Sequence, residues 1–76
     1  MEKIVGNFIV TRVDDGYGQR IVRISGKINA DLNFLEMIMD DNNIVAFRTV
    51  RRGLLSAGLI HVSIDALRMA LEMLSK

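Results

Sequence analysis

The N-terminal third of the chain has the residue pattern of two β-strands joined by a turn. Residues 3–13 are rich in β-branched and aromatic side chains, residues 14–18 favour a turn, and residues 19–28 resume the strand pattern. We expect a β-hairpin with a five-residue loop and Val13 opposite Gln19, because this register separates apolar from polar residues. The predicted apolar face holds Ile4, Phe8, Val10, Val22, Ile24 and Ile28.

A tighter turn is the alternative connection of this hairpin. Asp15 followed by Gly16 is a common two-residue turn signal. That turn would place Phe8 opposite Arg23 and mix the apolar and polar positions, so the longer loop is favoured.

From residue 29 the spacing of the apolar side chains changes to that of a helix. One side of the predicted helix carries Leu32, Leu35, Ile38 and Met39. We expect this helix over residues 29–43, capped by Asn29 and ended by Asn42 and Asn43 in the left-handed conformation.

A third strand is predicted over residues 44–50, which are mostly apolar and β-branched. Alternation along a strand points Val45 and Phe47 inward and Arg48 and Arg52 outward. The three phenylalanines of the chain are therefore all expected to be buried.

Residues 53–62 allow two interpretations, one short helix or a turn at residues 56–58 that feeds a fourth strand over residues 59–62. The β-branched residues Ile60 and Val62 favour the strand. We therefore expect a strand in this segment.

The C-terminal segment predicts a helix over residues 64–75, with Ser63 as its N-cap and Asp65 in its first turn. Apolar residues surround so much of this helix that we expect it to be covered on more than one side. The residues expected at a partner or dimer interface are Ile64, Leu67, Met69, Leu71, Met73 and Leu74.

Together these elements predict one small α+β domain over residues 1–76, in the order β-β-α-β-(β)-α. Its antiparallel sheet would carry two helices packed on one face. The other face is expected to be polar and mostly basic.

Composition adds an argument for oligomerisation. The chain has 76 residues, 50% of them apolar before its six glycines are counted, and no cysteine. A domain of this size buries only about 60% of the surface that its unfolded chain exposes, and here no disulfide can compensate. We therefore expect a homo-oligomer, with another protein as a further partner.

The chain shows no signal peptide or membrane span, which favours a cytoplasmic protein without a membrane partner. Its first residues include an acid at position 2 and no small-residue cleavage site. The longest stretch without a charged residue is the twelve residues 53–64, whereas a membrane span needs about 20 apolar residues.

No residue pattern predicts catalysis, a metal or a cofactor. His61 and Asp65 would lie four apart on a helix, but no nucleophile accompanies them. Residues 40–43 lack the alternating oxygen ligands of a calcium loop, and the glycines at 53 and 58 lack the lysine of a phosphate-binding loop. We expect a protein that is not an enzyme.

The net charge is only +1, but its distribution is uneven. All charges between residues 31 and 41 are acidic, whereas residues 16–30 and 42–64 carry only basic ones, so we expect a molecule with an acidic and a basic side. The candidate anion-binding residues are Arg23, Lys27, Arg48, Arg51 and Arg52.

Two functions follow from these patterns. The first is a small, non-catalytic interaction or regulatory module that forms homodimers and binds another macromolecule. The alternative is a nucleic-acid-binding protein that uses the basic sheet face, since lysine and arginine neutralise phosphates.

Overall fold

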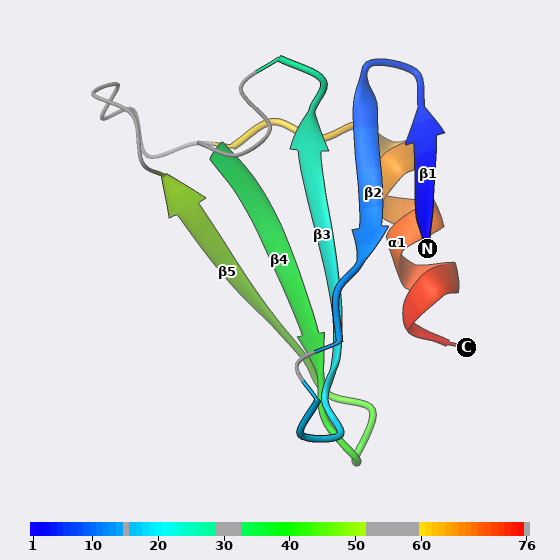
Figure 1. The fold of residues 1–76 in the computed structure, drawn as a ribbon, viewed down its shortest axis with the longest axis vertical. Helices are drawn as coiled ribbons and strands as arrows, with labels where there is room; N and C mark the ends of the chain where they lie inside the picture. The colour runs from blue at the N-terminus through cyan, green and yellow to red at the C-terminus, as the bar shows by residue number, and fades with distance from the viewer. Residues whose placement is uncertain (15, 29–32, 52–59, 76) are drawn as a thin grey trace.

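Five antiparallel strands, each paired with the next, form one sheet, and a helix follows them (Figure 1). The computed structural model describes residues 1–14, 16–28, 33–51 and 60–75. Its elements are β1 (Glu2–Val5), β2 (Phe8–Arg12), β3 (Arg20–Gly26), β4 (Asn33–Met39), β5 (Val45–Arg51) and α1 (Ile64–Leu74). The α+β class and the antiparallel sheet are confirmed. The second predicted helix is not found in the part of the chain that the structure describes.

A tight turn divides the first predicted strand in two. Gly6 has a φ of 60°, a left-handed conformation that glycine adopts without the Cβ clash of other residues, and it lets Val5 pair with Phe8 across a two-residue connection. Because the chain reverses here, Ile4 pairs with Ile9 and lies on the face opposite to the one predicted.

The hairpin of β2 and β3 is confirmed, but its predicted register is wrong by two residues. The N–H of Val13 donates to the carbonyl of Ile21 at 2.8 Å, so Val13 does not lie opposite Gln19. Gly16 and Gly18, with φ of 82° and 91°, give the longer connection its shape. Because the shift is even, every residue of this hairpin keeps its predicted face.

The predicted helix over residues 29–43 is wrong, because residues 33–39 form β4. Residues 29–32 lie outside the described part of the chain. Phe34 and Met37 are on opposite faces of β4 and are 3% and 0% exposed. A strand buried on both faces reads as a nearly continuous apolar run, which periodicity does not separate from a buried helix.

Residues 40–44 join β4 to β5, with a three-residue turn at residues 41–43. The N–H of Asp40 donates to the carbonyl of Ile44 at 3.1 Å, and the N–H of Asn43 donates to the carbonyl of Asp40 at 3.2 Å. Asn43 is left-handed, with a φ of 61°, as predicted, but it ends a strand connection and not a helix. Beyond this turn the pairing continues in one register to Asn33 opposite Arg51.

The C-terminal helix is confirmed, including its N-cap. The Ser63 hydroxyl accepts from the N–H of Ala66 at 3.1 Å, and Asp65 lies in the first turn. The strand predicted over residues 59–62 is not formed at residues 60–62, which have no regular structure, and residues 52–59 lie outside the described part of the chain.

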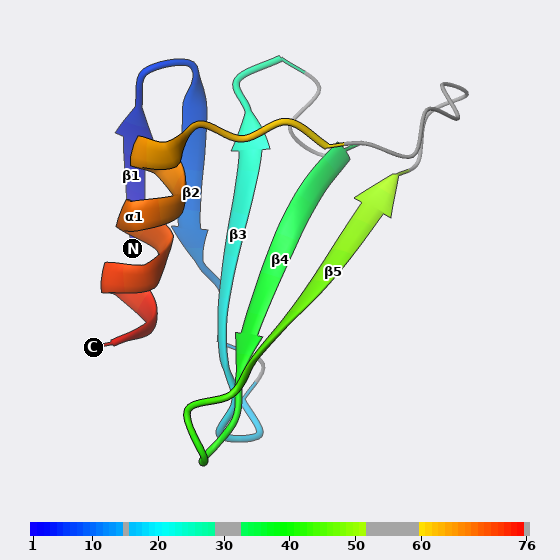
Figure 2. The same ribbon diagram turned by 180° about the vertical axis from the view of Figure 1, so that it is seen from behind.

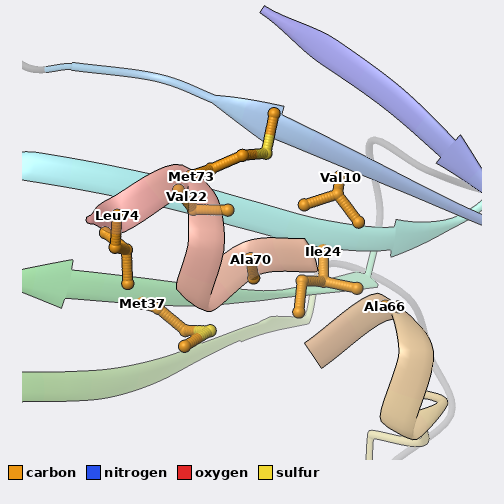
Figure 3. Packing of buried hydrophobic residues seen from close by; sticks show 8 residues of the cluster. All are labelled: Val10, Val22, Ile24, Met37, Ala66, Ala70, Met73 and Leu74. Carbon is orange, nitrogen blue, oxygen red and sulfur yellow. The ribbon is translucent and has the colours of Figure 1, made fainter. Parts of the chain in front are cut away.

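Helix α1 covers only one half of the sheet. It packs on β1, β2 and β3, while β4 and β5 extend beyond it (Figure 2). Ala66 and Ala70 face the sheet and are fully buried, and such small side chains allow a close approach. The core consists of Val10, Val22, Ile24, Met37, Ala66, Ala70, Met73 and Leu74 (Figure 3).

Two arginines from the sheet hold the C-terminal end of α1. Arg12 of β2 donates to the carbonyl of Met73 at 2.7 Å, and Arg20 of β3 donates to the carbonyl of Leu74 at 2.9 Å. The last turn of α1 contains no basic residue of its own. The two guanidinium groups therefore supply the positive charge that a helix C-terminus favours.

Candidate functional site

The sheet face that α1 covers remains apolar beyond the helix. Phe47 of β5 pairs with Met37 of β4, so the two side chains share this face. Met37 is fully buried, whereas Phe47 is 60% exposed, because α1 does not extend over β5. The burial predicted for Phe47 is therefore wrong.

Helix α1 carries an exposed apolar stripe, defined by Ile64, Leu67 and Leu71. Ile64 is 68% and Leu71 is 46% exposed, and Leu67 is partly buried. These residues continue around the helix from Leu74, which points toward Met37 of β4 (Figure 3). The stripe therefore lies on the side of α1 that faces the uncovered strands.

The six predicted interface residues divide into two groups. Met73 and Leu74 are 3% and 1% exposed and belong to the core of the chain itself, and Met69 is partly buried against it. The remaining three form the stripe. We refer to the stripe together with Val45 and Phe47 as the apolar surface.

The opposite face of the sheet carries an ion-pair network centred on Glu36. The strand register sets Arg23, Glu36 and Arg48 side by side on β3, β4 and β5. Arg23 Nη2 donates to Glu36 Oε2 at 3.0 Å, and Arg48 Nε donates to Glu36 Oε1 at 2.9 Å. Arg48 Nη2 donates to the same Oε1.

Glu36 is only 5% exposed and is held as a carboxylate. Burial raises the pKa of Glu36, but the hydrogen bonds from Arg48 and Arg23 lower it by more, so the pKa lies below its usual value of 4.5. Charge-assisted pairs of this kind satisfy a buried carboxylate that would otherwise be strongly destabilising.

Arg23 has a second contact that fixes its position. Its guanidinium carbon lies 4.1 Å from the centroid of the Phe34 ring, within cation–π range. The Arg23 Nε is buried without a hydrogen-bond partner. The guanidinium group is therefore held from two sides, by the Glu36 carboxylate and by the Phe34 ring.

The predicted polar, mostly basic face is therefore wrong in composition. Besides the network it carries apolar residues of all five strands, namely Ile4, Ile9, Ile21, Phe34, Ile38 and Val50. Glu36 of the acidic segment does not contribute to a separate acidic side, since it lies between two arginines. Acidic and basic groups alternate here.

Of the other candidate basic residues, Lys27 does not join this network. Lys27 follows β3 and is exposed, and Arg51 ends β5. Arg52 lies outside the described residues. The structure thus brings together Arg23 and Arg48 of the predicted set and adds Glu36, which sequence reasoning did not select.

The remaining candidate residues form no reactive group. His61 is exposed and precedes α1, so it does not share a helix turn with Asp65. The Asp40 carboxylate accepts from the N–H groups of Asn42 and Ile44 at 2.8 and 3.0 Å, so it stabilises the turn. Within the described ranges, no three His, Asp or Glu side chains cluster as metal ligands do.

The segments with glycine motifs add no site. Gly16 and Gly18 form the connection between two strands, as predicted, and the segment from residue 53 to residue 58 lies outside the described residues. No helix among the described residues is long and apolar enough to cross a membrane.

No protein-family model, curated protein or solved structure matches this chain. The function must therefore be inferred from the two surfaces described above.

Proposed function

We propose that this chain is a small cytoplasmic interaction or regulatory module that acts without catalysis, forms homodimers and binds another macromolecule. One observation supports this most strongly: the apolar face of the sheet continues past α1 and leaves Phe47 60% exposed. Adjoining exposed apolar residues are typical of protein contact sites.

The energetics favour association through the apolar surface. Burying an exposed Leu, Ile or Phe side chain contributes about 1.5–3 kcal/mol. Burial of Phe47 from both copies can therefore offset part of the entropy lost on association, which is roughly 4–15 kcal/mol.

Light scattering tests the oligomeric state. At concentrations of tens of micromolar we expect about twice the chain mass of 8.5 kDa. Phe47→Glu introduces a charge into the apolar surface and should convert the dimer to a monomer. Arg68→Glu adds the same carboxylate at a mainly exposed position outside the stripe and should leave the dimer intact.

The fold of both variants is checked by circular dichroism. A monomeric wild-type protein with a cooperative unfolding transition would contradict the proposal.

The alternative, nucleic-acid binding by the basic sheet face, has less support. Arg23 and Arg48 both bond to Glu36, so three side chains carry a net charge of only +1 at neutral pH. Arg48 is 60% exposed as a side chain, and Lys27 is exposed as well, so some positive surface remains.

A further inference from the structure

Strand β5 presents a backbone edge that no other described strand pairs with. It is the last strand in the sheet order, and no described segment pairs with its outer side. Its seven residues contain no proline, and its pairing with β4 has no bulge. Natural edge strands are protected by proline, bulges or charged side chains, and β5 has only the charges of Arg48 and Arg51.

The register shows which backbone groups are available on this edge. In an antiparallel pair, directly opposed residues alternate between hydrogen-bonded and non-hydrogen-bonded pairs. The hydrogen bond from Asp40 N–H to the Ile44 carbonyl shows that Asp40 and Ile44 are a hydrogen-bonded pair. Counting every second residue from there, the β5 residues hydrogen-bonded to β4 are Ala46, Arg48 and Val50. The N–H and C=O groups of Val45, Phe47, Thr49 and Arg51 therefore point outward.

We propose that a second copy of this chain pairs with β5 through the β5 strand of that copy, antiparallel and about a twofold axis at Phe47. This inference rests on the proposed homodimer and adds its mode of contact. A twofold axis places identical strands antiparallel, so each outward N–H meets an outward C=O of the other copy.

Charge and exposure favour a twofold axis at Phe47 over one at the neighbouring Arg48. An axis at Arg48 would set two like charges directly opposite each other, which is destabilising. An axis at Phe47 sets Arg48 opposite Ala46 and brings the two exposed Phe47 rings together on the helix side of the sheet. Aromatic cross-strand pairs stabilise sheets.

The described elements outside β5 leave room for this pairing. Helix α1 and the N-terminus lie on the β1 side of the sheet, at the opposite edge from β5 (Figures 1 and 2). The two helices of such a dimer would flank a shared apolar surface without contacting the new strand pair. The exposed stripe of each helix would face that shared surface.

Disulfide trapping tests the pairing, because the chain has no cysteine of its own. In the proposed register Phe47→Cys lies opposite itself at a Cα separation of about 5.5 Å, inside the range of about 4.4–6.8 Å that a disulfide spans. Thr49→Cys is the matched control. Its two copies would be offset by four residues, about 13 Å along the strand, and should not cross-link.

A mixture of Thr49→Cys and Val45→Cys proteins should cross-link, because these positions face each other in the proposed register. A disulfide formed by Arg48→Cys and not by Phe47→Cys would overturn the register.

A proline substitution tests the strand pairing independently and keeps the Phe47 ring in place. Thr49→Pro deletes an outward N–H and should weaken association at least about tenfold, since the symmetric dimer loses two hydrogen bonds. Thr49→Val keeps the N–H and should associate like wild type.

The outcomes separate this inference from the proposed function. A dimer by light scattering that resists Thr49→Pro and does not cross-link in the Phe47→Cys variant overturns the β5 contact while leaving the homodimer standing. A wild-type monomer overturns both, and binding of an extended peptide from another protein to a monomeric β5 edge does the same.

Discussion

Among single residues on the sheet face opposite α1, Glu36 is the one whose substitution should lower the stability of the fold most. Its carboxylate is nearly buried and receives hydrogen bonds from Arg23 and Arg48, which come from two different strands. Removing the carboxylate would leave two guanidinium groups close together with no acceptor between them. The network therefore ties β3, β4 and β5 together through one side chain.

Glu36→Gln should destabilise the fold by about 1–3 kcal/mol at pH 7, since the two arginines lose their anionic partner and bond only to a neutral amide oxygen. The pKa of Glu36 is lowered in the folded state, so its contribution is present above about 4.5, the unfolded value, and is lost as pH falls through the folded value. Urea unfolding from pH 7 to pH 3 measures both effects.

The exposed Glu72→Gln is the control for this experiment. It should leave the stability at pH 7 within about 0.5 kcal/mol of wild type. A Glu36→Gln protein as stable as wild type at pH 7 would show that the network does not stabilise the fold.

At the scale of elements, α1 has a defined contact at each end. Ser63 caps its N-terminus, and Arg12 and Arg20 bond to its last carbonyls. The two arginines come from β2 and β3, so the helix is anchored to the strands on which it packs.

Ser63→Ala should lower the free energy of unfolding by about 1 kcal/mol, because the N–H of Ala66 loses its acceptor. Ser63→Asp supplies another capping oxygen and should unfold close to wild type. Thermal or urea unfolding followed by circular dichroism measures the difference. Equal losses in both variants would show that the serine acts through something other than the cap.

Elements specified by local signals could be predicted from the sequence, and β4 could not. Ser63, Gly16 and Gly18 act within a few residues, so α1, the β2–β3 hairpin and β5 were predictable, whereas the turn at Gly6 that separates β1 from β2 was missed. The identity of β4 depends on burial of both its faces, which comes from packing distant in sequence. Without that knowledge its apolar run resembles a helix.

The stripe of α1 was easier to predict than the Glu36 network, because only the stripe depends on residues close together in sequence. The exposed residues Ile64 and Leu71 follow from the periodicity of a single helix. The Glu36 network requires the register of three strands, and its acidic and basic members are separated by twelve or more residues. Charges that are segregated along the chain therefore alternate across the sheet.

At the scale of the whole molecule, the sheet is wider than the helix that covers it. One helix spans β1 to β3, and the remaining two strands carry both the exposed Phe47 and the β5 edge, which no other described strand pairs with. The apolar surface and the β5 edge adjoin each other, so a single partner can engage both. This geometry favours the proposed association over anion binding.

Salt dependence distinguishes protein association from anion binding. Binding dominated by phosphate contacts weakens with salt by a log–log slope of about −0.7 per contact on single strands, so three to five contacts would give about −2 to −3.5. Because Glu36 occupies Arg23 and Arg48, we expect wild-type protein to show no slope this steep with mixed-sequence RNA or DNA at low ionic strength.

Glu36→Gln removes the negative charge that neutralises Arg23 and Arg48 and should therefore gain salt-sensitive binding, with a slope near −1.4 for two contacts. Glu72→Gln changes the net charge by the same amount on α1, away from the network, and should gain none. Fluorescence anisotropy of a labelled oligonucleotide at several salt concentrations gives the slopes. A wild-type slope of about −2 or steeper, lost in Arg48→Glu, would instead establish the nucleic-acid function and show that Glu36 leaves the two arginines free to contact phosphates.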